Sequence, residues 1–495
     1  MAKKWGIEYY VREHEIVLFW EKPKGKDGLR YQIFLNEKKV ADTTHTHTVI
    51  QNLEADTVYG IMVEVCDNSG KPCEMFVAQA IRTAIKKVCL DVTKPPYNAV
   101  GDGKTMDTVA LQRAIDDCDR NQRVYLPKGI YLTGSLRLHS HMELYLEEGA
   151  VLRGTENPED YLPKIKSRFE GIEMECYSSL LNLGEMDHKA GYTCEDVVIA
   201  GGGTIESGGK VLAQNVMVLE RKRLKEYIAS LGDEIKTYEN EDTIPGRARP
   251  RLINISNAKN VRISGLTLKN GASWNVHMIY SAHVLTDHCS FYSENVWNGD
   301  GWDPDSSTHC TIFACEFHTG DDSIAIKSGK NPEGNSINKP TKHIRIFDCK
   351  SFMGHGITIG SEMSGGIEDV AIWDCDMKHS MNGIEIKGTK KRGGYVRHVR
   401  VRDCEVPRVL IHSVSYNDDG IAAKKPPIFE DYKFTRLHIT GNYLEKDGVM
   451  NPCKAVDLYG FDLPGHELKN IRFCDCRIDG EISMRYCKQV TFKGI

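Results

Sequence analysis

The sequence lacks several features that are typical of membrane, nucleic-acid-binding and secreted proteins. No apolar stretch is long enough to span a bilayer, and residues Met1 to Glu8 do not form the apolar run of a signal peptide. The 64 basic and 69 acidic residues are interspersed and give a net charge of -5, so charge does not indicate a nucleic-acid or membrane partner. We therefore expect neither of these partners.

The 16 cysteines lack the spacing of a zinc site and the density of a small disulfide framework. Cys310 with Cys315 and Cys474 with Cys476 come nearest to metal-ligand spacing, but neither is followed by a second pair or by suitably spaced histidines. Most cysteines stand alone in strand-like contexts, which is typical of reduced thiols in a core. We expect no metal, no cofactor and a cytoplasmic location.

At 495 residues the chain is too long for one ordinary compact domain. Residues 1–88 alternate apolar and polar positions between turns, which predicts a small β-sandwich. Trp20, together with Tyr59 just after a turn, resembles the core and tyrosine corner of a fibronectin type III domain. This module could be a spacer, or it could contribute to substrate access or dimerisation, so a homo-oligomer stays an open alternative.

From Val124 onward, short apolar strands recur between turns of Gly, Asn and Asp. The unit apolar-x-apolar-x-Asp/Ala-Cys repeats with intervals of 26, 34, 26 and 29 residues between its cysteines, which are Cys289, Cys315, Cys349, Cys375 and Cys404. An irregular period of this length, built of strands and turns, is typical of a parallel β-helix. We predict an all-β protein in which a right-handed parallel β-helix over residues 89–495 follows the β-sandwich, with the cysteines stacked from coil to coil.

Two segments depart from this repeat. Residues 107–118 have helical spacing, with Asp107 or Thr108 as a possible cap, and we expect this helix to cover the open end of the solenoid. Residues 207–249 form an insertion that is helical over 211–236 and polar afterwards. Because insertions in solenoids commonly project from the binding face, it could be a wall of the active site or a plain surface excursion.

Three aspartates in two turns indicate acid/base chemistry. Asp321 and Asp322 are adjacent in Gly-Asp-Asp-Ser, and Asp300 lies in Asn-Gly-Asp-Gly. Adjacent carboxylates repel each other, which raises one pKa and leaves the partner ionised, as hydrolysis requires. A solvated acidic turn or a calcium loop is the alternative, although the spacing after Asp303 does not fit an EF-hand. His355 follows about one coil later and suggests a shared surface.

The chain resembles the polygalacturonases of glycoside hydrolase family 28. The resemblance covers most of residues 89–495, including Asn98–Gly103, Leu126–Tyr131 and Gly201–Ile205. It is most specific at four motifs, which are Asn298–Ser306, Gly320–Gly329, Gly354–Gly356 and Gly360–Gly366. Asp-Pro-Asp-Ser and Gly-Ser-Glu-Met-Ser-Gly-Gly within them are similar to the bacterial, exo-acting members.

The resemblance implies an inverting hydrolase of galacturonic-acid-containing pectic oligosaccharides. It implies that Asp321 is the general acid, that Asp300 and Asp322 activate the water, and that His355 tunes their protonation. The candidate substrate-binding residues are Asn298, Trp274, His277, Lys327, Glu385, Lys387 and Arg392. A cytoplasmic enzyme would meet imported oligosaccharides rather than cell-wall polymer, which favours an exo mode.

Glu385 departs from the family pattern, because the family's motif is Arg-Ile-Lys where this chain has Glu385-Ile386-Lys387. We expect Glu385 to pair with a neighbouring cation or to contact a hydroxyl-bearing substituent of the substrate. A rhamnogalacturonan or xylogalacturonan hydrolase of the same fold is therefore an alternative. A β-helix polysaccharide lyase and a non-catalytic carbohydrate-binding solenoid are more distant alternatives.

Overall fold

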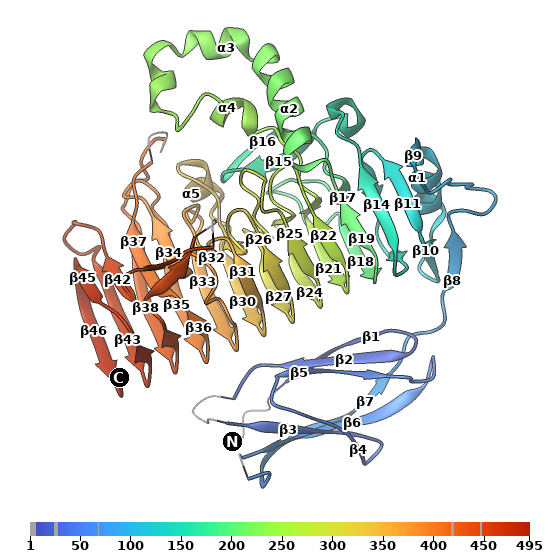
Figure 1. Ribbon diagram of the computed structural model, residues 1–495, viewed down its shortest axis with the longest axis horizontal. Coiled ribbons are helices and arrows are strands. Elements are labelled where there is room, and N and C mark those ends of the chain that lie inside the picture. Colours follow the sequence, from blue (N-terminus) through green and yellow to red (C-terminus); the bar gives the residue numbers. More distant parts are fainter. Residues whose placement is uncertain (1–5, 24–27, 68, 417–419, 446–447) are drawn as a thin grey trace. The chain divides into compact units, whose positions relative to one another are not determined.

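The computed structural model describes residues 6–23, 28–67, 69–416, 420–445 and 448–495. The chain divides into a small unit, Met1–Cys89 with Asn121–Arg123, and a large unit, Leu90–Arg120 with Val124–Ile495 (Figure 1). In the part of the chain that is described, no helix has the length and apolar composition needed to cross a bilayer.

The small unit consists of two antiparallel sheets. One contains β1 (Ile7–Val11), β2 (Glu15–Trp20) and β5 (His47–Gln51), and the other contains β3 (Arg30–Leu35), β4 (Lys38–Thr43), β6 (Val58–Cys66) and β7 (Pro72–Arg82). Trp20 and Tyr31 pack edge to face in its core, with ring centroids 5.0 Å apart. The hydroxyl of Tyr59 accepts the backbone N–H of Glu54 at 2.9 Å, the type of hydrogen bond that a tyrosine corner makes.

The large unit is a right-handed parallel β-helix, as the repeat predicts (Figure 1). Sheet I contains β8 (Val88–Asp91), β10 (Gln122–Leu126), β13 (Glu143–Leu146), β18 (Cys194–Gly201), β21 (Ala258–Ser264), β24 (Ala282–Asp287), β27 (Thr308–Phe313), β30 (Thr341–Phe347), β33 (Ile367–Trp373), β35 (Tyr395–Arg402), β38 (Ile428–Thr435), β43 (Leu468–Cys474) and β46 (Cys487–Lys493). Sheet II contains β9 (Asp102–Met106), β11 (Gly129–Thr133), β14 (Ala150–Gly154), β19 (Thr204–Glu206), β22 (Thr267–Lys269), β25 (Ser290–Tyr292), β28 (Glu316–His318) and β31 (Lys350–Met353), and β36 (Glu405–Val406), β39 (His438–Ile439) and β44 (Arg477–Ile478) form a separate sheet.

Sheet III carries the candidate site. It contains β12 (Leu136–Leu138), β17 (Leu181–Leu183), β20 (Ile253–Ser256), β23 (Val276–Ile279), β26 (Trp302–Asp305), β29 (Ile324–Ile326), β32 (Gly356–Ile359), β34 (Gly383–Gly388), β37 (Arg408–Ser413), β42 (Val456–Tyr459) and β45 (Ile482–Arg485). Two antiparallel hairpins lie outside the three sheets, β15 (Ile165–Phe169) with β16 (Ile172–Cys176), and β40 (Asn442–Leu444) with β41 (Met450–Pro452).

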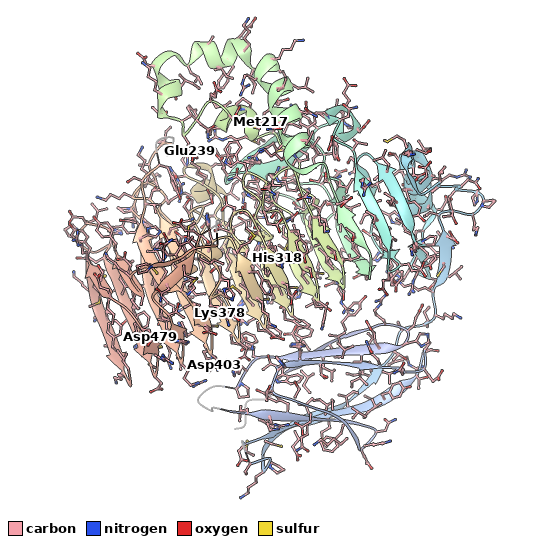
Figure 2. All side chains as sticks on the ribbon, in the orientation of Figure 1. Met217, Glu239, His318, Lys378, Asp403 and Asp479 are labelled. Carbon is pink, nitrogen blue, oxygen red and sulfur yellow. The ribbon has the colours of Figure 1, made fainter. Side chains whose placement is uncertain are left out.

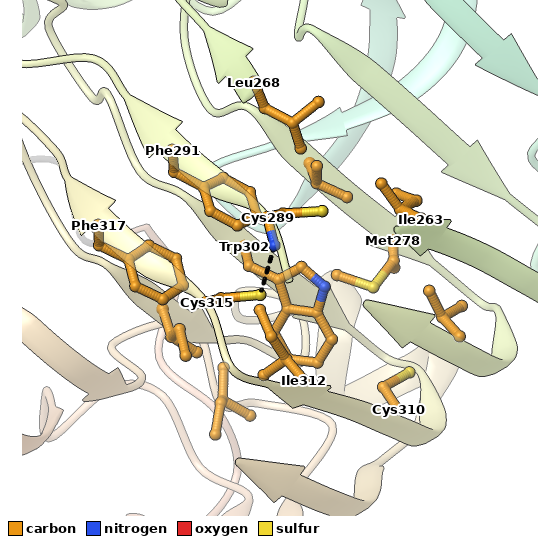
Figure 3. Close-up of a cluster of buried hydrophobic side chains, with 14 of the residues drawn as sticks. Ile263, Leu268, Met278, Cys289, Phe291, Trp302, Cys310, Ile312, Cys315 and Phe317 are labelled. Atoms are coloured by element: carbon orange, nitrogen blue, oxygen red, sulfur yellow. Dashed lines mark hydrogen bonds between the residues drawn. The ribbon is translucent and has the colours of Figure 1, made fainter. Parts of the chain in front are cut away.

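In each coil a single residue with a left-handed backbone forms the turn before the repeated cysteine, which explains the recurring Asp/Ala-Cys pair. His288, Ala314, Asp348, Asp374 and Asp403 have φ values between 49° and 55°. Asp is tolerated in this left-handed region because its short polar side chain can bond locally. In each case the next residue is one of the repeated cysteines, which is buried in the core. The backbone N–H of Cys289 contacts the sulfur of Cys315 at 3.4 Å, and Phe291 stacks on Phe317 beside them (Figure 3).

Helices occur at the two predicted places. α1 (Thr108–Asp117) buries Leu111, Ala114 and Ile115 against the first coils. The side chain of Asp107 makes no cap hydrogen bond to this helix and instead accepts the backbone N–H groups of Val100 and Gly101. The insertion forms α2 (Gly209–Arg223), α3 (Lys225–Ser230), the 3-10 helix η2 (Gly232–Thr237) and α4 (Thr243–Gly246), and shorter helices are η1 (Pro158–Tyr161) and α5 (Glu333–Ile337). Figure 1 shows the insertion, in green, beside the hairpin β15–β16.

Candidate active site

Four polar residues occupy the same position in four consecutive coils of sheet III. The strands are held in register by the pairs Trp302–Ile324, Ile324–Ile357 and Ile357–Ile384. The residues two positions before these are Asp300, Asp322, His355 and Asn382. Equivalent positions on adjacent strands lie about 4.8 Å apart. The spacing of about one coil, noted in the sequence, therefore becomes a row of side chains along one edge of the sheet.

A cavity of about 510 Å³ opens over Asp300, Asp322 and His355 of this row. Of the residues predicted to be catalytic or substrate-binding, those that line it are Trp274, Asn298, Asp300, Asp321, Asp322, Lys327, His355, Lys387 and Arg392. The other lining residues, which sequence reasoning did not identify as site residues, are Glu170, Glu239, Thr243, Trp297, Lys330, Gly360, Ser361, Glu362, Ser415 and Tyr416. Glu239 and Thr243 belong to the insertion, which therefore forms part of the wall; Glu239 is labelled in Figure 2.

His355 links the two adjacent aspartates. Its Nδ1 lies 3.1 Å from Oδ1 of Asp321 and 3.3 Å from Oδ1 of Asp322. The hydroxyl of Thr358 also donates to Oδ1 of Asp322, at 2.6 Å. Burial disfavours the charged imidazolium, but the hydrogen bonds and charges of the two aspartates prevail and raise the pKa of His355 to about 11. The imidazolium is therefore the protonated group of this cluster in the free enzyme.

The two adjacent aspartates are ionised in the free enzyme. Burial raises the pKa of Asp321, but the hydrogen bond from His355 and its charge outweigh burial and lower that pKa to about 2. Burial likewise raises the pKa of Asp322, and the charges of Lys387 and His355 lower it below its ordinary value. A general acid at Asp321 must consequently receive its proton when substrate binds, and His355 is the adjacent donor.

Asp300 belongs to a second carboxyl pair, with Asp303 beneath it. Lys327 Nζ lies 3.0 Å from Oδ2 of Asp300 and 3.6 Å from Oδ2 of Asp303. Burial raises the pKa of Asp303 to about 7 and that of Asp300 well above its ordinary value, although the charge of Lys327 opposes both shifts. Two buried carboxyls that share one cation thus retain a proton between them. This pair differs from the ionised pair, Asp321 and Asp322.

Trp274 and Asn298 form walls that buried arginines hold in place. The indole of Trp274 lies 4.3 Å from Lys327 Nζ and stacks on Phe169 of the hairpin β15–β16, with centroids 4.8 Å apart. The guanidinium of Arg249 donates to the side-chain oxygen of Asn298 at 2.7 Å. The guanidinium of Arg251 lies 4.9 Å from the ring centroid of Trp274, and because Arg249 and Arg251 are both buried, these contacts fix the orientation of both walls.

His277 does not reach the cavity, contrary to prediction. Its side chain is fully buried, 3.5 Å from Asp305, and Trp274 covers it at a centroid distance of 4.8 Å. Burial lowers the pKa of His277 to about 3, so its imidazole is neutral at ordinary pH. Asp305 accepts a hydrogen bond of 2.7 Å from Arg168 of the hairpin β15–β16. His277 thus belongs to the contact that attaches the hairpin to sheet III.

Glu385 is also absent from the described residues that line the cavity, contrary to the prediction that it binds substrate. It is 4% exposed, and its two oxygens face Asn382, Lys387 and His412. The expectation that it pairs with a neighbouring cation agrees with this geometry.

The site also meets the distance requirement for binding a metal ion. Ligand atoms of Asp321, Asp322 and His355 all lie within 4.8 Å of one another, which would suit a metal ion. A site that works without a metal therefore stays a prediction.

The chain is similar in sequence to known glycoside hydrolases. Residues 190–425 match the glycosyl hydrolases family 28, and residues 92–145 match a family described as rhamnogalacturonase A/epimerase, pectate lyase-like. The chain is 34% identical over 320 residues to a probable polygalacturonase of Vitis vinifera, covering 62% of this chain and 58% of the relative. The chain thus matches less than two thirds of that relative's length.

Two bacterial relatives are matched over more of their length. The exo-poly-alpha-D-galacturonosidase of Dickeya chrysanthemi is 26% identical over 484 residues, covering 86% of this chain and 79% of the relative. The endo-polygalacturonase of Pectobacterium parmentieri is 30% identical over 336 residues, covering 66% and 75%.

The fold has a close match among solved structures. The family 28 exopolygalacturonase of Yersinia enterocolitica superimposes with a TM-score of 0.81 at 21% identity, covering 99% of this chain and 96% of the other. This likeness confirms the predicted β-helix with a small β domain before it. Together with the family match and the row of Asp300, Asp322 and His355 on consecutive coils, it leads to one conclusion: the chain is a glycoside hydrolase that belongs to family 28.

Proposed function

We propose that this glycoside hydrolase cleaves galacturonic-acid-containing pectic oligosaccharides from a chain end, with inversion at the anomeric carbon. The observation that carries the proposal is the cavity in which the ionised pair, Asp321 and Asp322, meets the imidazolium of His355, with Asp300 on the adjacent coil. Inverting hydrolysis needs one carboxyl group that carries a proton and one that is ionised, on opposite sides of the scissile bond.

The residues divide into proton donor and proton acceptor as follows. Asp321 protonates the glycosidic oxygen, and it takes that proton from Nδ1 of His355 across the contact of 3.1 Å. Asp322, ionised and fixed by Thr358, accepts a proton from the attacking water. Asp300 holds the same water from the adjacent coil. The water is thereby positioned before its proton leaves.

The shape of the cavity supports an exo mode. Its walls come from the hairpin β15–β16 through Glu170, from the insertion through Glu239, and from the segment after β37 through Tyr416. Walls on several sides favour a chain end over the middle of a polymer. The name of the Dickeya relative, an exo-acting galacturonosidase, points in the same direction.

Product analysis on defined oligomers tests the proposal. Galacturonate oligomers should yield new reducing ends from one terminus, without the absorbing unsaturated products that a lyase releases. Proton NMR of fresh product should show the inverted anomer. Parallel assays on rhamnogalacturonan and xylogalacturonan oligomers would identify a hydrolase of those polymers, and binding without turnover of any oligomer would contradict the enzyme assignment.

The Asp321→Asn variant tests the acid. It should lower kcat by about 10²–10⁴-fold, the usual contribution of a general acid, at a temperature at which the variant remains folded. Asp369→Asn, on the outer side of β33, is the matched control and should keep wild-type turnover. Near-normal turnover of Asp321→Asn would overturn the mechanism.

We also propose that residues 1–88 form a fibronectin type III-like module and that the enzyme is cytoplasmic. The two antiparallel sheets and the hydrogen bond from Glu54 to Tyr59 support the first proposal. The buried, unpaired thiols of the cysteine stack support the second. Cell fractionation tests the location, with a disulfide-containing protein as the marker of the oxidising compartment.

A further inference from the structure

Lys387 presents an ammonium group to the cavity, but the buried carboxylate of Glu385 compensates that charge. Its Nζ lies 3.3 Å from Oε2 of Glu385. Burial disfavours the charged ammonium, whereas the negative charges of Asp322 and Glu385 raise its pKa well above the ordinary value. Lys387 is therefore charged at every ordinary pH, and its charge is already shared between two carboxylates.

Glu385 is fixed and permanently ionised. Oε1 lies 2.7 Å from Nε2 of His412, and Oε2 accepts the side-chain N–H of Asn382 at 2.8 Å. Burial raises the pKa of Glu385, but Lys387 and His412 outweigh burial and lower that pKa to about 2. With partners at both oxygens, this carboxylate cannot turn away when a ligand enters.

A different part of the cavity wall is cationic. Lys330 and Arg392 both line the cavity and are 5% and 2% exposed. The side-chain oxygen of Asn331 accepts a hydrogen bond of 2.8 Å from Arg392. Because Asn331 directly follows Lys330, this bond connects Arg392 to the segment that carries Lys330. Glu362 lines the cavity near them. Lys330 and Arg392 offer cations to a ligand carboxylate, whereas Lys387 already has Glu385 as an ion-pair partner.

We propose that Glu385 makes the subsite over Lys387 selective for a sugar unit without an ionised carboxyl group, either a neutral pyranose or an esterified uronate. The unit at Lys330 and Arg392 keeps its carboxylate. A uronate over Lys387 would meet two cations, Lys387 and the imidazolium of His355, and three carboxylates, Glu385, Asp321 and Asp322, so repulsion outweighs attraction. Since like charges at close range disfavour a partner, the subsite rejects it. This inference rests on the proposed function and specifies its substrate.

The test compares three oligomers of equal length: unesterified galacturonate, methyl-esterified galacturonate, and galacturonate alternating with a neutral sugar. The wild-type enzyme should show a kcat/KM on at least one of the last two that is about tenfold or more above that on the first. Preference for the esterified oligomer identifies the ester, and preference for the alternating oligomer identifies the neutral pyranose. Faster cleavage of the unesterified oligomer than of both others would overturn the inference, whatever the variants do.

Removing the charge of Glu385 should reverse the preference in part. Glu385→Gln retains a hydrogen-bonding side chain, and it should raise kcat/KM on the unesterified oligomer about tenfold, through KM, without raising it on the uncharged substrates. Glu316→Gln, at an exposed position of β28, changes the net charge equally and should leave all three values unchanged. An equal loss on all three substrates would show that Glu385 only supports the wall, and would overturn the inference. Absence of turnover on every oligomer would instead refute the proposed function.

Discussion

Lys327 holds together the carboxyl pair, Asp300 and Asp303, so its removal should change the charge of the site. In Lys327→Met, the thioether stem keeps the packing over Trp274, and the ammonium 3.0 Å from Asp300 is lost. Removing one partner of a buried ion pair costs about 3–5 kcal/mol if the remaining charge is retained. Carboxyl groups avoid that cost by binding protons, and one pKa unit corresponds to about 1.4 kcal/mol.

Asp303, with a pKa of about 7, is already about half protonated at neutral pH. Because the charge of Lys327 opposes protonation of both carboxyls, its loss lets the pair keep its protons to higher pH, and Asp300 then accepts a hydrogen bond from the attacking water less readily. We expect kcat/KM at pH 7 to fall about tenfold or more. The acidic limb of the pH profile should move toward alkaline pH by about one unit or more, so that activity partly returns as the pH rises.

The assay is the pH profile of kcat/KM on one oligomer for the wild type, for Lys327→Met and for Lys350→Met. Lys350 is an exposed residue of β31, and its substitution changes the net charge equally. If the profile of Lys327→Met falls uniformly at every pH, Lys327 supports the wall without setting the charge of Asp300. If it is unchanged, the carboxyl pair has no part in the reaction.

Two further predictions concern pH and redox state. Pairing raises the pKa of His355 from 6.5 to about 11 and lowers that of Asp321 from 3.8 to about 2, so the pair stabilises the fold fully between pH 3.8 and 6.5. His355→Gln should therefore lower the melting temperature most in that window, and the difference from wild type should shrink as the pH rises from 6.5 toward 11. The cysteine stack should be reduced, so mass spectrometry should find no disulfide and dithiothreitol should leave the melting temperature unchanged; a clear drop would contradict the cytoplasmic proposal.

The sequence predicted the coils well because their chemistry is local. A strand, a left-handed residue and a buried cysteine recur in each coil, as at Asp348 and Cys349, and each can be recognised without knowledge of its neighbours. The row of Asp300, Asp322 and His355 could be predicted as well, because the coil length alone decides which residues become adjacent.

The features of the site that could not be predicted depend on segments that lie outside the sequence repeat. His277 stands in register with Asp303 on sheet III, yet the hairpin β15–β16 and Trp274 cover it, and no pattern in the sequence places that hairpin. Lys330 and Tyr416 reach the cavity from connecting segments for the same reason. Glu385 was identified by its departure from a motif, but its hydrogen-bond partner His412 lies in the next coil and had no signal in the sequence.

In sheet III, the backbone register that fixes the fold does not depend on which functional side chain each coil carries. Every coil spans the distance from one strand to the next with a turn of its own length, while backbone hydrogen bonds fix where the strand begins. A residue gained or lost in the connection between β29 and β30 can be absorbed there, whereas a slip of one residue inside β29 would exchange its inner and outer faces. Selection can therefore replace the functional side chain of one coil without disturbing the next, and a single scaffold can acquire new sugar specificities one position at a time.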